Sequence, residues 1–200
     1  MRAQRRLGLL GGTFDPPHYG HLVAAQEAAV QLGLERVLFL PARQNPLKRG
    51  EPSSSVEDRC AMVAAAIGDD GRFELSRADI DRPPPSYTAD LLRALSSDDC
   101  ELYFLVGADI LPELHRWRAP EEIVRLARLA VVNRPGAAAP NLAALTRDLP
   151  AARDRVDILR LPGVDISSTE LRGRVRAGLP IRYLVPPAVE EYIMAKGLYR

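Results

Sequence analysis

Apolar runs and segments of helical period alternate along the first 40 residues of the chain. Residues 7–10 form an apolar run typical of a buried strand, and apolar side chains then recur on one helical face from Leu22 to Leu32. Gly33 predicts a left-handed end to this helix, and residues 36–40 predict a second buried strand. This is the pattern of a βαβ unit, in which the crossover is right-handed and the strands are parallel.

The same alternation continues through most of the chain. The further predicted strands are 72–81, 101–106, 129–133 and 156–161, and the further predicted helices begin near 54, 88, 109, 120 and 141. Ser54 and Glu57 fit a capping box for the first of these helices. The pattern predicts an α/β fold with a Rossmann-like, doubly wound parallel sheet, whose ligand lies beyond the carboxyl ends of the strands.

Residues 165–200 predict a small helical C-terminal extension. Ser167 and Glu170 fit a capping box for a helix that ends at Gly178, and another helix follows it. A chain of 200 residues is long enough to bury the core of one α/β domain. We therefore predict a single domain over residues 1–200.

Composition and charge exclude several classes of function. The net charge is +1, with acids and bases interspersed, which argues against a nucleic-acid footprint and against a basic membrane-binding face. Cys60 and Cys100 are far apart in sequence and show no metal-binding spacing, which argues for reduced thiols and against a zinc site. Since no apolar run approaches the ~20 residues of a membrane span, we expect a soluble, cytoplasmic protein. The sequence leaves the oligomeric state open, a homo-oligomer included.

The strand-to-helix turn after residue 10 is the strongest candidate site. Gly11 and Gly12 let backbone N–H groups approach an anion, and the helix that starts near Gly20 points its positive end at the same place. His18 and His21 are three residues apart and share one side of the first helical turn. A glycine turn with two surface histidines is the alternative. Because two of the chain's three histidines converge here, we predict a phosphate site.

Three later segments are candidate ligand sites at the same edge of the sheet. Asp109 follows a strand that ends in Gly107, where a carboxylate can accept hydrogen bonds from ribose hydroxyls or simply cap the next helix. Thr88 stands at a helix start, which can receive a carboxylate or be only a cap. Trp117 can stack on a flat ligand ring or pack on the core.

The loop over residues 41–55 leaves the second strand at this edge and can close over the site. It contains Arg43, Asn45 and Lys48, and Lys48 is one of only two lysines in the chain. A solvated loop lysine is an equally good interpretation.

The helix start at Ser167 carries a second anion-binding pattern. Its first N–H groups, the hydroxyls of Ser168 and Thr169, and Arg172 one turn later face whatever precedes the helix. A cap explains the serines but does not explain the arginine.

Taken together, these motifs resemble a known family. His18-Tyr19-Gly20-His21 matches the HxGH signature of the nucleotidyltransferase superfamily, and Gly11-Gly12-Thr13-Phe14-Asp15-Pro16 is similar to the opening of the bacterial nicotinate-nucleotide adenylyltransferases. Ile166-Ser167-Ser168-Thr169 with Arg172 resembles that family's triphosphate-binding motif. Gly107-Ala108-Asp109 with Trp117, and the segment ending in Tyr87-Thr88, are also similar.

The resemblance implies a nucleotidyltransferase fold and transfer of an adenylyl group from ATP to nicotinate mononucleotide, giving deamido-NAD and pyrophosphate. It implies Mg²⁺ carried by the ATP phosphates, with no metal ligands from the protein. The implied catalytic residues are His18, His21 and Arg172. The implied ATP-binding residues are Gly11, Gly12, Thr13, Phe14, Gly107, Asp109, Ile166, Ser167, Ser168 and Thr169. The implied mononucleotide-binding residues are Asp15, Asn45, Lys48, Tyr87, Thr88 and Trp117.

Two other functions stay open at this stage. One is a sister nucleotidyltransferase that uses nicotinamide mononucleotide or phosphopantetheine. Asp79, Asp81 or Asp90 would favour the amide if its carboxylate pointed into the pocket. The other is a nucleotide-binding protein without catalysis, which would not need His18, His21 and Arg172 together.

Overall fold

A six-stranded parallel sheet in the order β3-β2-β1-β4-β5-β6 forms the centre of the computed structural model. The structure describes residues 4–43, 54–83, 85, 87–133 and 139–200. The strands are β1 Arg5–Gly12, β2 Arg36–Pro41, β3 Phe73–Leu75, β4 Cys100–Gly107, β5 Ala127–Val132 and β6 Val156–Leu159. The strand order reverses between β1 and β4, so the predicted doubly wound sheet is confirmed, and its ligand crevice falls between these two strands.

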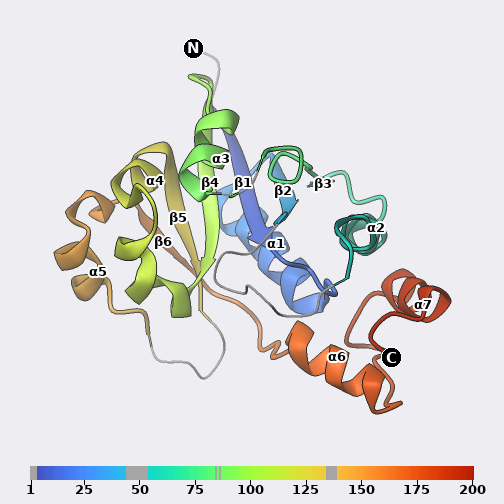
Figure 1. The fold of residues 1–200 in the computed structure, drawn as a ribbon. Helices are drawn as coiled ribbons and strands as arrows, with labels where there is room; N and C mark the ends of the chain where they lie inside the picture. The colour runs from blue at the N-terminus through green and yellow to red at the C-terminus, as the bar shows by residue number, and fades with distance from the viewer. Residues whose placement is uncertain (1–3, 44–53, 84, 86, 134–138) are drawn as a thin grey trace.

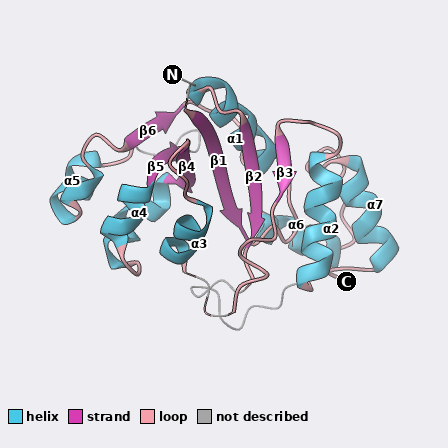
Figure 2. Ribbon diagram, turned by 90° about the horizontal axis from the view of Figure 1, so that it is seen from above, coloured by secondary structure: helices cyan, strands magenta, loops and turns pink. Residues whose placement is uncertain are grey.

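Helices cover both faces of the sheet (Figure 1). They are α1 Tyr19–Leu32, α2 Val56–Ile67, α3 Thr88–Leu95, α4 Pro120–Leu126, α5 Leu142–Asp148, α6 Ser168–Arg176 and α7 Pro187–Lys196, with 3₁₀ helices η2 Ala108–Arg116 and η3 Pro150–Ala152. Figure 2 shows α1 on one face and α3 and α4 on the other. No helix in the described ranges is both long enough and apolar enough to cross a membrane.

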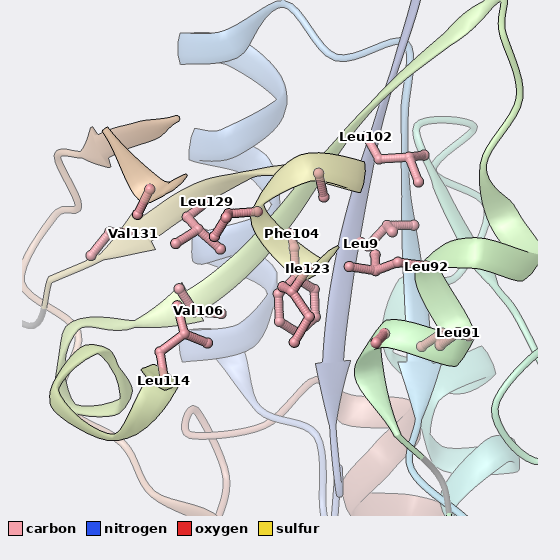
Figure 3. Packing of buried hydrophobic residues seen from close by; sticks show 14 of the residues in the cluster. Leu9, Leu91, Leu92, Leu102, Phe104, Val106, Leu114, Ile123, Leu129 and Val131 are labelled. Atoms are coloured by element: carbon pink, nitrogen blue, oxygen red, sulfur yellow. The ribbon is translucent and has the colours of Figure 1, made fainter. Parts of the chain in front are cut away.

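The two faces of the sheet bury separate hydrophobic clusters because successive strand residues point to opposite sides. Leu9 of β1 packs with Phe104 and Ile123 in the cluster that covers the α3 and α4 face (Figure 3). Its neighbour Leu10 packs instead with Leu105 and the alanines of α1. The β1 and β4 strands are therefore buried on both sides, and their carboxyl ends are held rigidly.

The C-terminal helices form a third cluster beside the sheet. Figure 2 shows α7 next to α2, and Met62 of α2 is fully buried against Leu171 of α6 and Ile193 of α7. The predicted helical extension is confirmed, and the cluster joins it to the helix that follows β2.

Two local predictions are wrong. The predicted strand over 72–81 is only three residues long, because β3 pairs with β2 from Phe73 to Leu75 and the chain then turns, with Asp81 N–H donating to the carbonyl of Arg77. The first residue of the predicted capping box is also displaced by one position. Ser55 caps α2 by accepting from Asp58 N at 3.0 Å, whereas Ser54 N–H donates to the carboxylate of Asp15.

The absence of a side chain at Gly8 in β1 leaves room for Leu34, in the segment that follows α1, and for Val37 of β2. A Cβ there would lie 2.8 Å from Leu34 Cδ1 and 3.0 Å from Val37 Cγ2. Overpacking of this kind costs about 1–3 kcal/mol. We expect Gly8→Ala to lower the urea midpoint of unfolding accordingly, whereas Gly71→Ala, where a Cβ meets nothing within 4 Å, leaves it nearly unchanged. Equal midpoints for both variants would contradict this account of the packing.

Candidate active site

A cavity of about 720 Å³ opens at the carboxyl ends of β1 and β4. Most of the predicted site residues line it. They are Gly11, Gly12, His18, His21, Tyr87, Thr88, Gly107, Asp109, Trp117, Ile166, Ser167, Ser168 and Thr169. The structure thus brings together the glycine turn, the start of α3, the end of β4 and the start of α6, four segments that are far apart in sequence.

The floor of the cavity is the glycine turn after β1. A Cβ on Gly12 would lie 3.0 Å from the ring of Phe14, so glycine is needed where that ring folds under the turn. Phe14 has a left-handed backbone (φ 53°) and is buried, with its ring edge-on to His21 at 5.0 Å. Thr13 offers its carbonyl to Arg59 at 2.9 Å. Thr13 and Phe14 therefore support the turn and do not line the cavity.

The two histidines stack on each other at the start of α1. Their ring centroids are 3.8 Å apart, and His18 N–H donates to His21 Nδ1 at 3.2 Å. Because Nδ1 of His21 is the acceptor, this bond assigns the proton of the neutral imidazole to Nε2, which can donate to a ligand. A ring that donates through Nε2 suits a phosphate oxygen.

The positive end of α1 is not neutralised by acidic side chains in its own first turn. The first turn of α1 contains no acidic residue, whereas that of α2 contains Glu57 and Asp58 and that of α4 contains Glu121 and Glu122. Carboxylates in a first turn stabilise a helix through its dipole. Their absence at α1 leaves the positive end to the ligand, which we expect to be an anion.

The start of α6 is fixed to the same turn by side-chain donors. Ser167 caps the helix, Ser168 Oγ donates to the carbonyl of Pro16 at 2.8 Å, and Arg172 Nη1 donates to the carbonyl of Asp15 at 2.8 Å. Arg172 does not line the cavity, and its Nε is buried with no hydrogen-bond partner among the described residues. The guanidinium of Arg172 therefore contacts the backbone of the glycine turn.

The Asp15 carboxylate, predicted to contact the mononucleotide, is buried beneath the turn. Its exposed fraction is 2%, and it accepts from Tyr199 Oη at 2.6 Å and from Ser54 N at 3.2 Å. Burial, and then the hydrogen bond to Asp15, raise the pKa of Tyr199 far above its ordinary value, so that the hydroxyl keeps its proton. The carboxylate of Asp15 thus has one partner before α2 and one in the C-terminal segment, and Asp15 does not line the cavity.

The opposite wall is aromatic and cationic. Trp117 lies edge-on to Phe104 at 6.4 Å, and the guanidinium of Arg118 lies 4.4 Å from the ring centroid of Tyr87, which precedes α3. All three aromatic residues line the cavity. A flat, negatively charged ring system fits such a wall.

The end of β4 forms the third side of the cavity. A Cβ on Gly107 would overlap the carboxylate of Asp109, which therefore folds back over the strand end only because residue 107 is glycine. The N-cap of η2 is Gly107, so Asp109, which lies in the first turn, is not the capping residue. Its carboxylate is available to accept hydrogen bonds from ligand hydroxyls.

Several residues of the site were missed by sequence reasoning, and two predicted ones are outside the described ranges. Asn45 and Lys48 lie outside the residues that the structure describes. Arg116 and Arg118 line the cavity and were not predicted as site residues. Asp79 also lines it and was considered only as an acid that could favour an amide. In the sequence, only their position on either side of Trp117 could have indicated that Arg116 and Arg118 belong to the site.

Of the three nearby acids, only Asp79 lines the cavity. Its carboxylate is buried and accepts from Arg43 N at 3.0 Å. Asp90 is bound by Arg93, whose hydrogen bond is the largest cause of its lowered pKa, and Asp81 pairs with Arg77. Asp79 is therefore the one acid of the three that a ligand in the cavity can meet.

The chain has the features of a nucleotide-binding α/β protein. These are the reversal of strand order, the glycine turn and the paired imidazoles at the start of a helix. Residues 9–174 match the family model described as cytidylyltransferase-like, and the chain belongs to this family. A relative from Roseiflexus sp. (strain RS-1), named "probable nicotinate-nucleotide adenylyltransferase", is 51% identical over 97% of this chain and 98% of its own length. One from Saccharopolyspora erythraea with the same name is 46% identical over the whole chain and 92% of its own length. Within the family, the chain is therefore one of the nicotinate-nucleotide adenylyltransferases.

Solved structures show the same fold at low sequence identity. The Plasmodium falciparum nicotinic acid mononucleotide adenylyltransferase complexed with NaAD has a TM-score of 0.78 and 18% identity, over 98% of this chain and 97% of that one. The same enzyme complexed with APC has a TM-score of 0.77. The sheet order and the helical layers are therefore those of a solved adenylyltransferase.

The His18 ring lies where a side chain at position 20 would be. A Cβ on Gly20 would lie 3.0 Å from both Cε1 and Nδ1 of His18. We expect Gly20→Ala to displace this ring and to lower turnover about tenfold or more, because small displacements of a catalytic group are costly.

A matched control is available in α6. Gly173→Ala adds a methyl group within a helix where nothing lies within 4 Å, and it should keep or raise stability without loss of turnover. Melting temperature and steady-state turnover are measured on both variants. If Gly20→Ala were as active as Gly173→Ala, the His18 ring would not need its observed position.

Proposed function

We propose that the protein transfers the adenylyl group of ATP to nicotinate mononucleotide, forming deamido-NAD and pyrophosphate. The observation that carries this proposal is one cavity with an anion site of paired imidazoles at one side and an aromatic, cationic wall at the other. Relatives of nearly full length carry the corresponding name. A solved structure of the same fold is complexed with NaAD.

The chemistry needs positioning and positive charge, without a protein nucleophile. A phosphate oxygen of the mononucleotide attacks the α-phosphorus of ATP in line, a new P–O bond forms, and the bond to the β-phosphate oxygen breaks to release pyrophosphate. Donors that meet the charge developing on the transferring group lower the barrier. The N–H groups of the glycine turn and the Nε2 proton of His21 are such donors.

We assign the phosphates to the side of the cavity between α1 and α6. His18 and His21 would donate to the α- and β-phosphates, and Ser168, Thr169 and Arg172 to the β- and γ-phosphates. The guanidinium of Arg172 uses Nη1 on the carbonyl of Asp15 and has further N–H groups to offer. Gly11, Gly12, Thr13 and Phe14 would contribute through the backbone of the turn.

We assign the two nucleosides to the remaining walls. Gly107 and Asp109 would hold the adenosine ribose, with Ile166 and Ser167 on the far side. Tyr87, Thr88 and Trp117 would hold the nicotinate ring, and Asn45 and Lys48 are proposed to close over the mononucleotide. Asp15 would act on the mononucleotide through the turn, since its carboxylate is occupied by Tyr199 and Ser54.

Mg²⁺ is proposed to enter with ATP. Within the described ranges, no three His, Cys, Asp or Glu side chains are grouped to hold a metal ion. Mg²⁺ commonly binds substrate phosphates and water with few protein ligands, so phosphate oxygens can supply most of its coordination here. We further propose one domain over residues 1–200 and a cytoplasmic location, since Cys60 and Cys100 are both free thiols.

A second candidate function is the use of nicotinamide mononucleotide. The observation that favours it is Asp79, a buried carboxylate on the cavity wall that could accept from an amide. Its bond to Arg43 N already uses part of its acceptor capacity. The two functions differ only in whether the substrate presents a carboxylate or an amide to the start of α3.

Comparison of the two mononucleotides tests the proposal. The N–H and O–H donors at the start of α3 match a carboxylate, whereas an amide brings its own donors against them, and sites built on such bonds discriminate by several powers of ten. We expect kcat/KM to be at least about 1000-fold higher for the acid than for the amide, in an assay of pyrophosphate release. Near-equal values would support dual specificity, and Asp79→Asn would then be expected to weaken the amide selectively.

Arg172→Ala tests the assignment of the outer phosphates. A charge-assisted hydrogen bond is worth about 1.5–3 kcal/mol, which corresponds to about 10- to 100-fold in affinity. We expect the KM for ATP to rise by this factor and the KM for nicotinate mononucleotide to change much less. Arg174→Ala is the matched control, because Arg174 lies on the same helix but donates to the carbonyl of Pro180. Equal weakening of both substrates by Arg172→Ala would mean that the arginine only fixes the turn.

A further inference from the structure

The carboxylate of Asp15 lies in a closed group of three hydrogen-bonded residues. Tyr199 Oη donates to Asp15 Oδ1 at 2.6 Å, Ser54 N–H donates to the same carboxylate at 3.2 Å, and Ser54 Oγ donates to Tyr199 Oη at 3.0 Å. Asp15 is 2% exposed. A buried carboxylate is costly unless hydrogen bonds satisfy it, so these donors hold the side chain in one place.

We propose that Tyr199, which follows α7, is a positioning residue for adenylyl transfer. Its hydroxyl fixes Asp15 and thereby sets the position of the glycine turn and of the two histidines that meet the phosphates. This inference rests on the proposed function for its effect on catalysis. Tyr199 itself does not line the cavity and does not touch the reacting atoms.

The coupling from Tyr199 to the site passes through short contacts. The carbonyl of Asp15 accepts from Arg172, so a shift of Asp15 moves the partner of a predicted phosphate ligand. The residue before Asp15 is Phe14, whose ring is edge-on to His21 at 5.0 Å. A displaced carboxylate would therefore disturb both the α1 and the α6 sides of the phosphate site.

Tyr199 is well anchored for this task. Gly197 has a left-handed backbone (φ 62°) that ends α7 and turns the chain, and Tyr199 itself has φ 65°, a region that non-glycine residues rarely adopt. The Tyr199 side chain packs against the cluster that contains Met62 and Ile193, with its hydroxyl 3.8 Å from Met62 Sδ. Packing of the Tyr199 ring thus stabilises its unfavourable backbone conformation. In this conformation the Tyr199 hydroxyl reaches Asp15.

The environment of the Tyr199 hydroxyl favours its protonated, donating form. Burial and the neighbouring Asp15 carboxylate raise the pKa of Tyr199, while Ser54 and Arg172 act in the opposite direction with smaller effect. Tyr199 therefore keeps its proton and can donate it to the Asp15 carboxylate.

Tyr199→Phe removes the hydroxyl and keeps the ring in the cluster. We expect kcat to fall about 10- to 100-fold, because a misplaced catalytic group costs rate, with both KM values within about threefold of the parent. The matched control is Tyr192→Phe on α7, whose hydroxyl donates to the Asp58 carboxylate at 2.9 Å and, within the described part of the chain, makes no hydrogen bond to the turn. Tyr192→Phe should keep kcat within about twofold.

An independent readout comes from the imidazole NMR signals. The chain has three histidines, His18, His21 and His115. In Tyr199→Phe without substrate, we expect the ring signals of His18 and His21 to shift while those of His115 stay in place. In Tyr192→Phe all three should stay in place. A loss of general stability alone would not select the two site histidines.

A double-mutant cycle keeps the proposal falsifiable if the single variant is poorly stable. In an Asp15→Ala background, Tyr199→Phe should change kcat less than twofold, since the bond it removes is already gone. The proposal is overturned if Tyr199→Phe keeps parental kcat, if His18 and His21 signals do not move, or if both losses add in the double variant. Failure of the parent to form deamido-NAD would instead refute the proposed function, and the NMR comparison would still decide the coupling.

Discussion

The buried, hydrogen-bonded carboxylate of Asp15 is the constraint on which the position of the glycine turn depends. The glycine turn has little regular structure of its own, and its carbonyls and carboxylate are held by Arg59, Ser168, Arg172 and Tyr199 from elements outside β1. A buried polar group left without partners costs about 1–3 kcal/mol. The turn therefore has a defined position only when α2, α6 and the segment after α7 are in place around it.

The strands and the helices contribute different properties to the site. β1 and β4 are buried on both faces, so their carboxyl ends form a rigid floor at the point where the strand order reverses. Glycines at positions 12 and 107 keep that floor free of side chains where Phe14 and Asp109 need the space. Helix α1 adds a positive electrostatic potential at this edge, because its first turn contains no acidic residue.

Much of the fold and of the site could be predicted from the sequence. The βαβ unit, the strand-to-helix turn with His18 and His21, and the start of α6 at Ser168 all follow from residues within a few positions of one another. The prediction of a strand over 72–81 was wrong because it rested on a local pattern alone. Its alternation of apolar residues is local, but the length of a strand is set by how far its neighbour pairs with it, and β2 offers partners only from Val37 to Phe39.

The sequence by itself determined which residues stand at the ends of strands and at the starts of helices, because periodicity, glycine conformations and capping act over a few residues. Only the tertiary structure decided what those residues touch. Asp15 meets Ser54 across 39 positions, its carbonyl meets Arg172 across 157, and its carboxylate meets Tyr199 across 184. No local pattern distinguishes a carboxylate that faces a ligand from one that is buried under the turn. That difference is fixed by where three separate helices bring their donors when the core packs.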